Sequence, residues 1–179
     1  MKKNLLFLCV LLINGMVYSQ SLESQKIELW CRNDLSKWGE TLTIGNGLDY
    51  VDGTLIIDFN RLKGGNAKMA SLNIPFSNLE SNAEYEITFE YQANKAGSVF
   101  PNYPEPDPEG KKDDKGNLKP KSTWMQLKND GKWTFFSDTF IFDPSINKGT
   151  FGIFFRADQI EGLVLKIKSL KIEKVEKKK

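Results

Sequence analysis

The sequence predicts an all-β protein built as a sandwich of two packed sheets. Its 179 residues are 40% hydrophobic and 12% aromatic, which is typical of a folded globular domain. Apolar and polar residues alternate with a period of two, and Gly, Asn and Asp separate the alternating segments. Hardly any segment has the period of a helix. Seven or more half-buried strands must cover their apolar faces, so two packed sheets are expected.

The first segment of the chain, residues 1–19, has the pattern of a signal peptide. Lys2 and Lys3 give it a positive start, and residues 5–13 are an unbroken run of nine apolar residues. This run is too short to span a bilayer, which needs about 20 residues. We therefore expect export to the periplasm, the cell surface or the extracellular space. The mature chain is expected to be one domain over residues 20–179, with no membrane span.

Charge and histidine content exclude several functions. Without Lys2 and Lys3 the chain has 23 basic and 23 acidic residues, so a basic surface for nucleic acid is not expected. The sequence contains no histidine, which excludes Ser/His/Asp triads, Cys/His dyads and imidazole metal sites.

Seven segments of the mature chain are predicted as strands. The clearest is residues 84–91, because apolar odd-numbered residues from Tyr85 to Tyr91 alternate with mostly acidic even-numbered ones. The other predicted strands are residues 54–59, 67–74, 123–128, 132–142, 150–156 and 163–173.

Two local features refine this prediction. Residues 129–131, Asn-Asp-Gly, predict a hairpin turn between two strands, because Asp and Gly tolerate positive φ. In the last strand the apolar pattern that includes Ile167 resumes at Leu170, one residue out of phase. A β-bulge at Lys168 or Ser169 restores the inward face.

Residues 94–122 interrupt the strand rhythm and are predicted as a Pro-rich loop. Five of the seven prolines lie here: Pro101, Pro104, Pro106, Pro108 and Pro120. Structureless segments longer than about 15 residues are usually binding loops or disordered insertions. We expect an ordered rim over residues 97–103 and a mobile excursion over residues 105–121.

Four segments carry a family resemblance. They read YEITFEYQA at residues 85–93, WTFFSDTF at 133–140, FGIFF at 151–155 and LKIKSLKI at 165–172. Their order resembles that in carbohydrate-binding modules of families 4, 9 and 22. The resemblance covers about residues 85–173 and implies a jelly-roll β-sandwich of two antiparallel sheets, of the galactose-binding-like type. It implies a secreted, non-catalytic module that recognises a polysaccharide or oligosaccharide.

The resemblance also bears on cofactors. The family's closing strand usually has acidic residues, one of which helps bind a structural calcium, where this chain has Lys168 and Ser169. Because lysine cannot ligate calcium, we expect no cofactor. Trp133 matches a family tryptophan that is structural, so it is left out of the site. Four carboxylates in the Pro-rich segment have spacing that matches no calcium loop: Asp107, Glu109, Asp113 and Asp114.

Sugar recognition requires an exposed aromatic ring for the apolar face of a pyranose, with amide, carboxylate or guanidinium groups beside it. The candidate stacking residues are Trp38, Phe100, Tyr103 and Trp124, which lie outside the core alternation. The candidate polar neighbours are Gln92, Gln126 and Arg156. In the strand over residues 150–156, Phe154 and Arg156 share a face with Gly152, opposite the apolar face, so both faces are partly covered or one of them carries a ligand.

Two other classes of function are open. Jelly-roll scaffolds also host glycan-degrading enzymes, and Glu84, Glu86 and Glu90 on one strand face can supply a carboxylate pair about 5 to 9 Å apart. Acidic alternation is, however, also usual on the solvent face of a strand. The other alternative is an interaction or adhesion module for partner proteins in the envelope, with an exposed apolar patch of several hundred Å² and no groove.

Overall fold

The computed structural model describes residues 26–32, 41–61 and 68–176, and strands dominate these ranges. The other elements are a 3₁₀ turn at Phe59–Arg61 and two one-turn helices, α1 (Pro144–Asn147) and α2 (Ala157–Ile160). The strands are β1 (Glu28–Arg32), β2 (Thr41–Ile44), β3 (Gly47–Val51), β4 (Thr54–Asp58), β5 (Met69–Pro75), β6 (Glu84–Ala93), β7 (Gly97–Pro106), β8 (Pro120–Ser122), β9 (Met125–Leu127), β10 (Thr134–Ile141), β11 (Thr150–Arg156) and β12 (Val164–Lys174).

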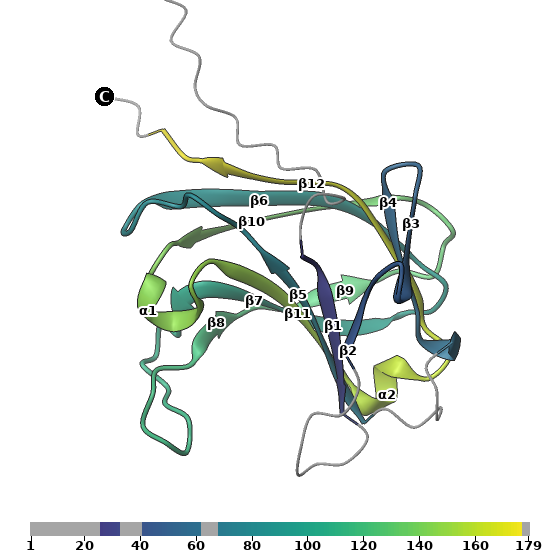
Figure 1. Ribbon diagram of the computed structural model, residues 1–179, viewed down its shortest axis with the longest axis horizontal. Coiled ribbons are helices and arrows are strands. Elements are labelled where there is room, and N and C mark those ends of the chain that lie inside the picture. The colour runs from purple at the N-terminus through teal and green to yellow at the C-terminus, as the bar shows by residue number, and fades with distance from the viewer. Residues whose placement is uncertain (1–25, 33–40, 62–67, 177–179) are drawn as a thin grey trace, which may run out of the picture.

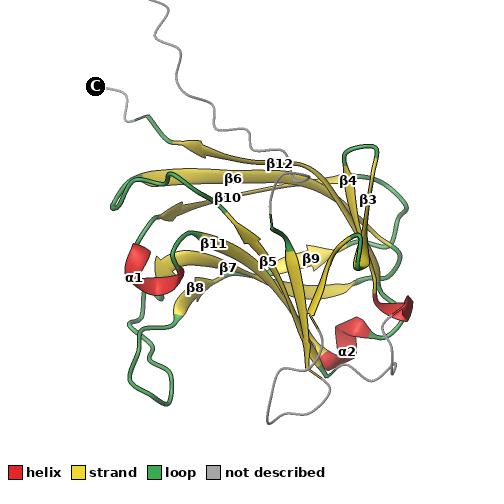
Figure 2. Ribbon diagram, in the orientation of Figure 1, coloured by secondary structure: helices red, strands yellow, loops and turns green. Residues whose placement is uncertain are grey.

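The strands form two layers that face each other (Figures 1 and 2). We call the layer with the order β10-β6-β12-β4-β3 sheet I, and the layer with the order β2-β1-β5-β11-β7-β8 sheet II. Strand β9 belongs to sheet II, because it pairs with β7. Neighbouring strands are antiparallel except β2 and β3, whose short parallel pairing links the two layers. The predicted all-β sandwich is confirmed.

The hydrophobic core lies between the layers, because each strand turns alternate residues inward. In β6 the inward Ile87 and Phe89 are buried, and in β11 so are Phe151 and Ile153. Phe89 of sheet I and Phe151 of sheet II meet with their ring centroids 6.1 Å apart. Each large apolar side chain buried in this way contributes about 1.5–3 kcal/mol. Alternation leaves the other residues of each strand on the outer faces, where a ligand can reach them.

The predicted bulge in β12 is confirmed. The pairing of β12 with β6 shifts register between Lys168 and Lys171, and Ser169 has a φ of 55°. The extra residue brings Leu170 back into the core after Ile167.

The prediction of a loop over residues 94–122 is wrong for much of its length. Strands β7 and β8 occupy both ends of the segment, and the expected rim over residues 97–103 is part of β7. The prolines make these segments look unlike strands in the sequence, because proline has no N–H for the hydrogen bonds between strands and is rare inside sheets. Residues 107–119 between the strands form a folded excursion, closed by a hydrogen bond from the Asp107 amide to the Lys119 carbonyl (2.9 Å).

The turn at residues 129–131 does not make the predicted hairpin. Its geometry is tight, since Gly131 has a φ of 68° and the Lys132 amide donates to Oδ1 of Asp130 (3.0 Å). The strands that it joins belong to different layers, because β9 pairs with β7 and β10 pairs with β6. The turn therefore carries the chain from sheet II to sheet I.

Candidate functional site

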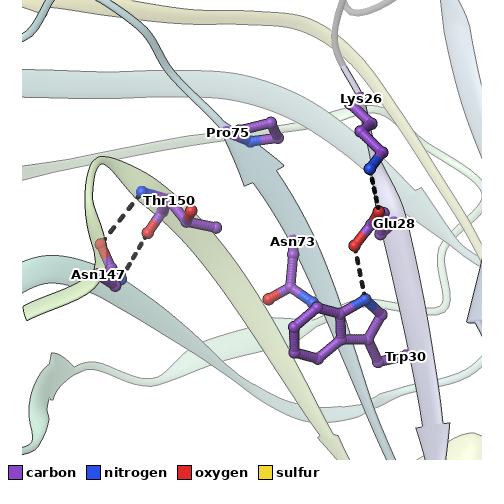
Figure 3. Close-up of a pocket in the computed structure, with 7 residues that line it drawn as sticks. All are labelled: Lys26, Glu28, Trp30, Asn73, Pro75, Asn147 and Thr150. Atoms are coloured by element: carbon purple, nitrogen blue, oxygen red, sulfur yellow. Dashed lines mark hydrogen bonds and ion pairs between the residues drawn. The ribbon is translucent and has the colours of Figure 1, made fainter.

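The outer face of sheet II is hollowed. Strands β5, β11 and β7 curve so that the concave side of the sheet points away from sheet I (Figure 1). A pocket of about 440 Å³ lies on this concave face. Figure 3 shows β1 on one wall of the pocket, β5 between, and the start of β11 on the other wall. The residues that line it are Lys26, Glu28, Trp30, Asn73, Pro75, Asn147 and Thr150.

An aromatic row crosses this concave face. Cross-strand register aligns Trp30 of β1 with Ser71 of β5, Ser71 with Phe154 of β11, and Phe154 with Phe100 of β7. Trp124 extends the row, with its ring edge-on to Phe100 at 4.9 Å between centroids. The side chains are accessible at the two ends of the row, where Trp30 is 39% and Trp124 is 71% exposed. The four strands separate Trp30 from Phe100 by about 14 Å.

A polar row runs beside the aromatic row, displaced from it by two residues along each strand. It aligns Glu28, Asn73, Gly152, Asn102 and Ser122. The Nδ2 groups of Asn73 and Asn102 each donate one hydrogen bond to the carbonyl of the residue two positions earlier, both at 3.1 Å. An amide nitrogen carries two hydrogens, so each of these side chains keeps one donor for a ligand.

Gly152 lies between the two amides in the register of the strands. A Cβ atom at this position would lie 3.4 Å from the Leu72 carbonyl oxygen, 3.7 Å from the Asn102 Cβ and 3.8 Å from Oδ1 of Asn73, which are close but ordinary contact distances. The backbone would therefore accept a side chain here. Gly152 itself is buried, and it contributes no side chain to the floor between the two amides.

Glu28 fixes the indole of Trp30 at one end of the row. The Trp30 Nε1–H donates to Oε2 of Glu28 (2.8 Å), and the Lys26 ammonium lies 3.3 Å from the other carboxylate oxygen (Figure 3). The hydrogen bond from Trp30 holds the pKa of Glu28 below its ordinary value. Burial opposes this shift, and the hydrogen bond and charge of Lys26 add smaller lowering effects.

The opposite wall of the pocket is built by α1 and the turn into β11. Asp143 caps α1 by accepting from the Ser145 amide (2.8 Å). The hydrogen bond from the Ser145 side chain, and then that from its amide, lower the pKa of the Asp143 carboxyl. Asn147 then exchanges two hydrogen bonds with the backbone of Thr150, at 2.8 and 3.1 Å. These bonds hold the wall that faces Trp30 (Figure 3).

The structure brings four of the predicted site residues to the concave face. Phe100 and Trp124 are part of the aromatic row, and Arg156 follows Phe154 on the same side of β11. Gln126 of β9 lies beside Ser98, whose hydroxyl donates to Oε1 of Gln126 (3.0 Å).

Tyr103 is a wrong prediction. Its ring is fully buried between Phe140 and Phe151, and its hydroxyl donates to Oδ2 of Asp138 (2.6 Å) while bonding Oγ1 of Thr123 (3.0 Å). Burial, and then the bond to Asp138, raise the pKa of Tyr103 well above its usual range. Tyr103 anchors β7 to sheet I and offers no surface for stacking.

Gln92 is also misplaced by the prediction, and Trp38 lies outside the described residues. Gln92 belongs to β6 of sheet I, where its Nε2 donates to the Gly131 carbonyl. It lines a separate pocket of about 380 Å³ and is remote from the aromatic row. Trp133 also lies beside sheet I, with the Lys168 ammonium 4.1 Å from its ring centroid.

Sequence reasoning missed Trp30, Asn73 and Asn102. The signal for Trp30 is its place between Leu29 and Cys31, two buried residues of β1, because alternation then turns Trp30 outward. No comparable signal marks the asparagines, since an outward Asn on a strand is usually just solvated.

The carboxylates of the catalytic alternative lie on the outer face of sheet I. Glu86 accepts from the Ser137 hydroxyl (2.6 Å), and Glu90 lies 3.6 Å from the Lys168 ammonium. Within the described ranges there is no group of three or more His, Cys, Asp or Glu side chains that could hold a metal ion. The helices in those ranges are too short to cross a bilayer.

Comparison with known proteins identifies the fold. No family model matches the chain, and no curated protein matches it. A solved family 4 carbohydrate-binding module superposes with a TM-score of 0.53 at 12% identity, over 83% of this chain and 86% of the other. The N-terminal cellulose-binding domain of β-1,4-glucanase C from Cellulomonas fimi superposes with a TM-score of 0.51 at 11% identity, over 86% and 91%.

The fold is that of a carbohydrate-binding module. The jelly-roll sandwich implied by the sequence resemblance is thereby confirmed. In this carbohydrate-binding-module fold, sheet II carries the aromatic row, the polar row and the pocket on one concave face. The acidic face of β6 belongs to sheet I.

Proposed function

We propose that the protein binds a glycan on the concave outer face of sheet II and does not alter it chemically. The observation that supports this most is the register of Trp30, Phe154 and Phe100 in one row, with Trp124 at its end. Flat rings at intervals across a concave face match a chain of pyranose rings, each of which has an apolar face.

The polar row supplies the second half of the recognition. The amides of Asn73 and Asn102 flank Gly152, which has no side chain, and give directional hydrogen bonds to sugar hydroxyls. Stacking and a few solvent-exchanged hydrogen bonds contribute only a few kcal/mol after the entropy cost of association. We therefore expect modest affinity.

The proposed place of action is outside the cytoplasm. The signal-peptide pattern of residues 1–19 supports export, after which the domain over residues 20–179 meets polysaccharides in the periplasm, at the surface or in the medium.

Affinity electrophoresis against plant, algal and microbial polysaccharides tests the function. Trp124→Ala and Phe154→Ala are expected to lower the affinity for the bound glycan about 10-fold or more, as truncating an aromatic anchor does. Phe135→Ala is the matched control, because Phe135 is a 67% exposed ring on β10 of sheet I. Equal effects of all three variants would place the site elsewhere.

A protein-interaction module is the second candidate. Phe135 and the 48% exposed Ile141 favour it, because both are apolar side chains on the outer side of β10. Ser137 and Thr139 lie between them. If no polysaccharide binds, and Phe135→Ser abolishes capture of an envelope protein while Trp124→Ala does not, this second candidate replaces glycan binding.

A further inference from the structure

The pocket that contains Gln92 lies on the outer side of sheet I. Its volume of about 380 Å³ is within the range of about 300–1,000 Å³ that is typical of small-molecule sites. The end of β6, the start of β12 and the turn at residues 129–131 line it. Gln92 of β6 and Lys166 of β12 are direct cross-strand partners, and both turn outward because their neighbours along each strand are buried.

Hydrogen bonds hold both walls of this pocket. On one side, Nε2 of Gln92 donates to the Gly131 carbonyl and fixes the turn against β6. On the other side, the Asn94 side chain accepts from the Val164 amide (2.7 Å) and donates to the Gly162 carbonyl (2.8 Å), so the end of β6 is tied to the start of β12. A pocket that is already held in shape costs a ligand less ordering entropy.

Polar side chains of the lining have unused hydrogen-bonding capacity. Within the described ranges, no hydrogen bond or ion pair reaches the side chain of Asn129 or the ammonium of Lys166. Lys166 is half-buried, whereas Lys168, two residues later, lies 3.6 Å from the Glu90 carboxylate. Gln92 uses one N–H of its amide on the turn and keeps the other. The pocket therefore offers an ammonium and two amides to a ligand that carries several hydroxyls.

Trp133 adds an aromatic ring at the margin of the pocket. It comes directly before Thr134, which pairs with Tyr91, so its backbone lies next to that of Gln92. The Trp133 side chain is 36% exposed, and the Lys168 ammonium lies 4.1 Å from its ring centroid. An exposed ring beside amide and ammonium donors is the combination that sugar recognition requires.

We propose that this pocket is a second saccharide site, so that one molecule of the protein joins two glycan chains; the joining of chains rests on the proposed function. The two sheets face each other across the core, so their outer faces point in opposite directions (Figure 1). A chain on the concave face of sheet II and a chain in the sheet I pocket therefore do not compete for space.

The chemistry of the pocket assigns it a neutral sugar. Asp130 lies within the turn that lines the pocket, and Glu90 is the next outward residue of β6 before Gln92. These carboxylates offset the positive charges of Lys166 and Lys168 and disfavour an anionic ligand. The pocket volume, at the small end of the range for ligand sites, fits a chain end or a branch.

An NMR titration that follows the indole N–H signals tests for the second site. The mature protein is titrated with neutral tetrasaccharides of glucose, mannose, xylose and galactose. With at least one of them the Trp133 signal is expected to shift, with an affinity about 10-fold weaker than that seen at Trp30 or Trp124, because the pocket has fewer rings for stacking. Loss of one signal in Trp133→Phe assigns the resonance.

Variants locate this response in the pocket. Lys166→Met and Asn129→Ala remove side-chain groups that bond no described residue, so the fold should be kept. Each is expected to weaken the binding seen at Trp133 about 5-fold, and both together more than 10-fold, with binding seen at Trp30 changed less than 2-fold. Lys171→Met is the matched control, because Lys171 is an exposed lysine of β12 beyond the bulge and outside the pocket.

Light scattering tests whether the protein joins chains. A soluble polysaccharide that retards the protein in electrophoresis is mixed with increasing amounts of protein. Scattering should rise at intermediate ratios and fall again at excess protein, when each chain site has its own protein molecule. The rise should be absent from the double variant Lys166→Met with Asn129→Ala, and from Trp124→Ala, because each of these proteins has lost one of its two sites.

The outcomes separate this inference from the proposed function. A Trp133 signal that moves with no tetrasaccharide, or an equal loss in Lys166→Met and Lys171→Met, overturns the second site and leaves the proposed function intact. A response at Trp133 that the pocket variants weaken, without any response at Trp30 or Trp124, overturns the proposed function and keeps the pocket. Undiminished scattering by the double variant overturns the joining of chains.

Discussion

The indole of Trp30 is hydrogen-bonded to the carboxylate of Glu28, two residues earlier on the same strand, with 2.8 Å between Nε1 and Oε2. Both side chains are on the outer side of β1, so the carboxylate sets the direction in which the ring faces the pocket (Figure 3). An aromatic ring that is already oriented loses less entropy when a sugar stacks on it.

Replacing Glu28 is therefore expected to weaken glycan binding without harming the fold. Glu28→Ala should lower affinity about 5-fold, which corresponds to one lost positioning hydrogen bond. Glu28→Gln keeps an oxygen acceptor and should lower it less than 2-fold. Isothermal titration calorimetry of both variants checks this expectation. Identical losses of affinity would show that binding depends on the charge of Glu28 and not on its side-chain oxygen as a hydrogen-bond acceptor.

The same pair predicts how binding depends on pH. The pKa of Glu28 is lowered below 4.5, chiefly by the bond from Trp30, so the carboxylate stays ionised and the bond stays intact at neutral and mildly acidic pH. The contribution is lost as pH falls through this lowered pKa. Affinity of the wild type for a neutral glycan should be flat from pH 7 to 5 and then fall, whereas that of Glu28→Gln should not show this fall.

Adding a large side chain at residue 152 is expected to block the concave face. Gly152→Leu should reduce glycan affinity about 10-fold or more, because the added side chain occupies the floor between Asn73 and Asn102. Because Gly152 is buried and an added Cβ would lie 3.4 Å from the Leu72 carbonyl oxygen, the leucine is also expected to lower the melting temperature, and binding is measured on the folded variant. Gly152→Ala is the control with a small effect on both. Full binding by Gly152→Leu would contradict the assigned floor.

Binding should also depend on the length of the saccharide. The aromatic row spans about 14 Å from Trp30 to Phe100, with Trp124 beyond, so a monosaccharide reaches only one end of it. Titration with oligosaccharides of increasing length should show affinity rising until both tryptophans are covered and then levelling off. Trp124→Ala should move the plateau to a shorter chain. A monosaccharide that binds as tightly as the longer chains would contradict this.

Tyr103 is expected to affect stability and not recognition. Tyr103→Phe removes the hydroxyl that bonds Asp138 and Thr123, which should lower the free energy of unfolding by about 1–3 kcal/mol. Urea denaturation measures this loss. Glycan affinity of the folded variant should equal that of the wild type, and a specific loss of binding would return Tyr103 to the site.

The successes and errors of the sequence analysis have physical causes. Strands with clear alternation, such as β6 and β11, and the slip in β12 that signals a bulge, were predictable because local periodicity reports which face is buried. Tyr103 was assigned to the wrong side, because the prolines suggested a loop and hid its parity with Val99, which is also buried. Read as a strand, the segment turns Phe100 outward and Tyr103 inward.

The error at Gln92 has a different origin. Its outward direction on β6 follows from alternation with Tyr91, but the layer to which β6 belongs depends on strand order. Strand order is set by contacts between residues far apart in sequence, which local patterns do not contain. Trp30 and Phe154 come together for the same reason, through separate registers with Ser71 of β5.

The prolines of β7 and β8 affect whether copies of this domain can pair through the edge of sheet II. A row of unpaired N–H and C=O groups at a sheet margin invites a neighbouring molecule to add its own strand. Here β8, the last strand of sheet II, is only three residues long, starts with Pro120 and pairs with β7 at Asn102 and Pro106 across a register shift. Such a broken margin is a poor template, so this end of the sheet resists self-association even when many copies are crowded together.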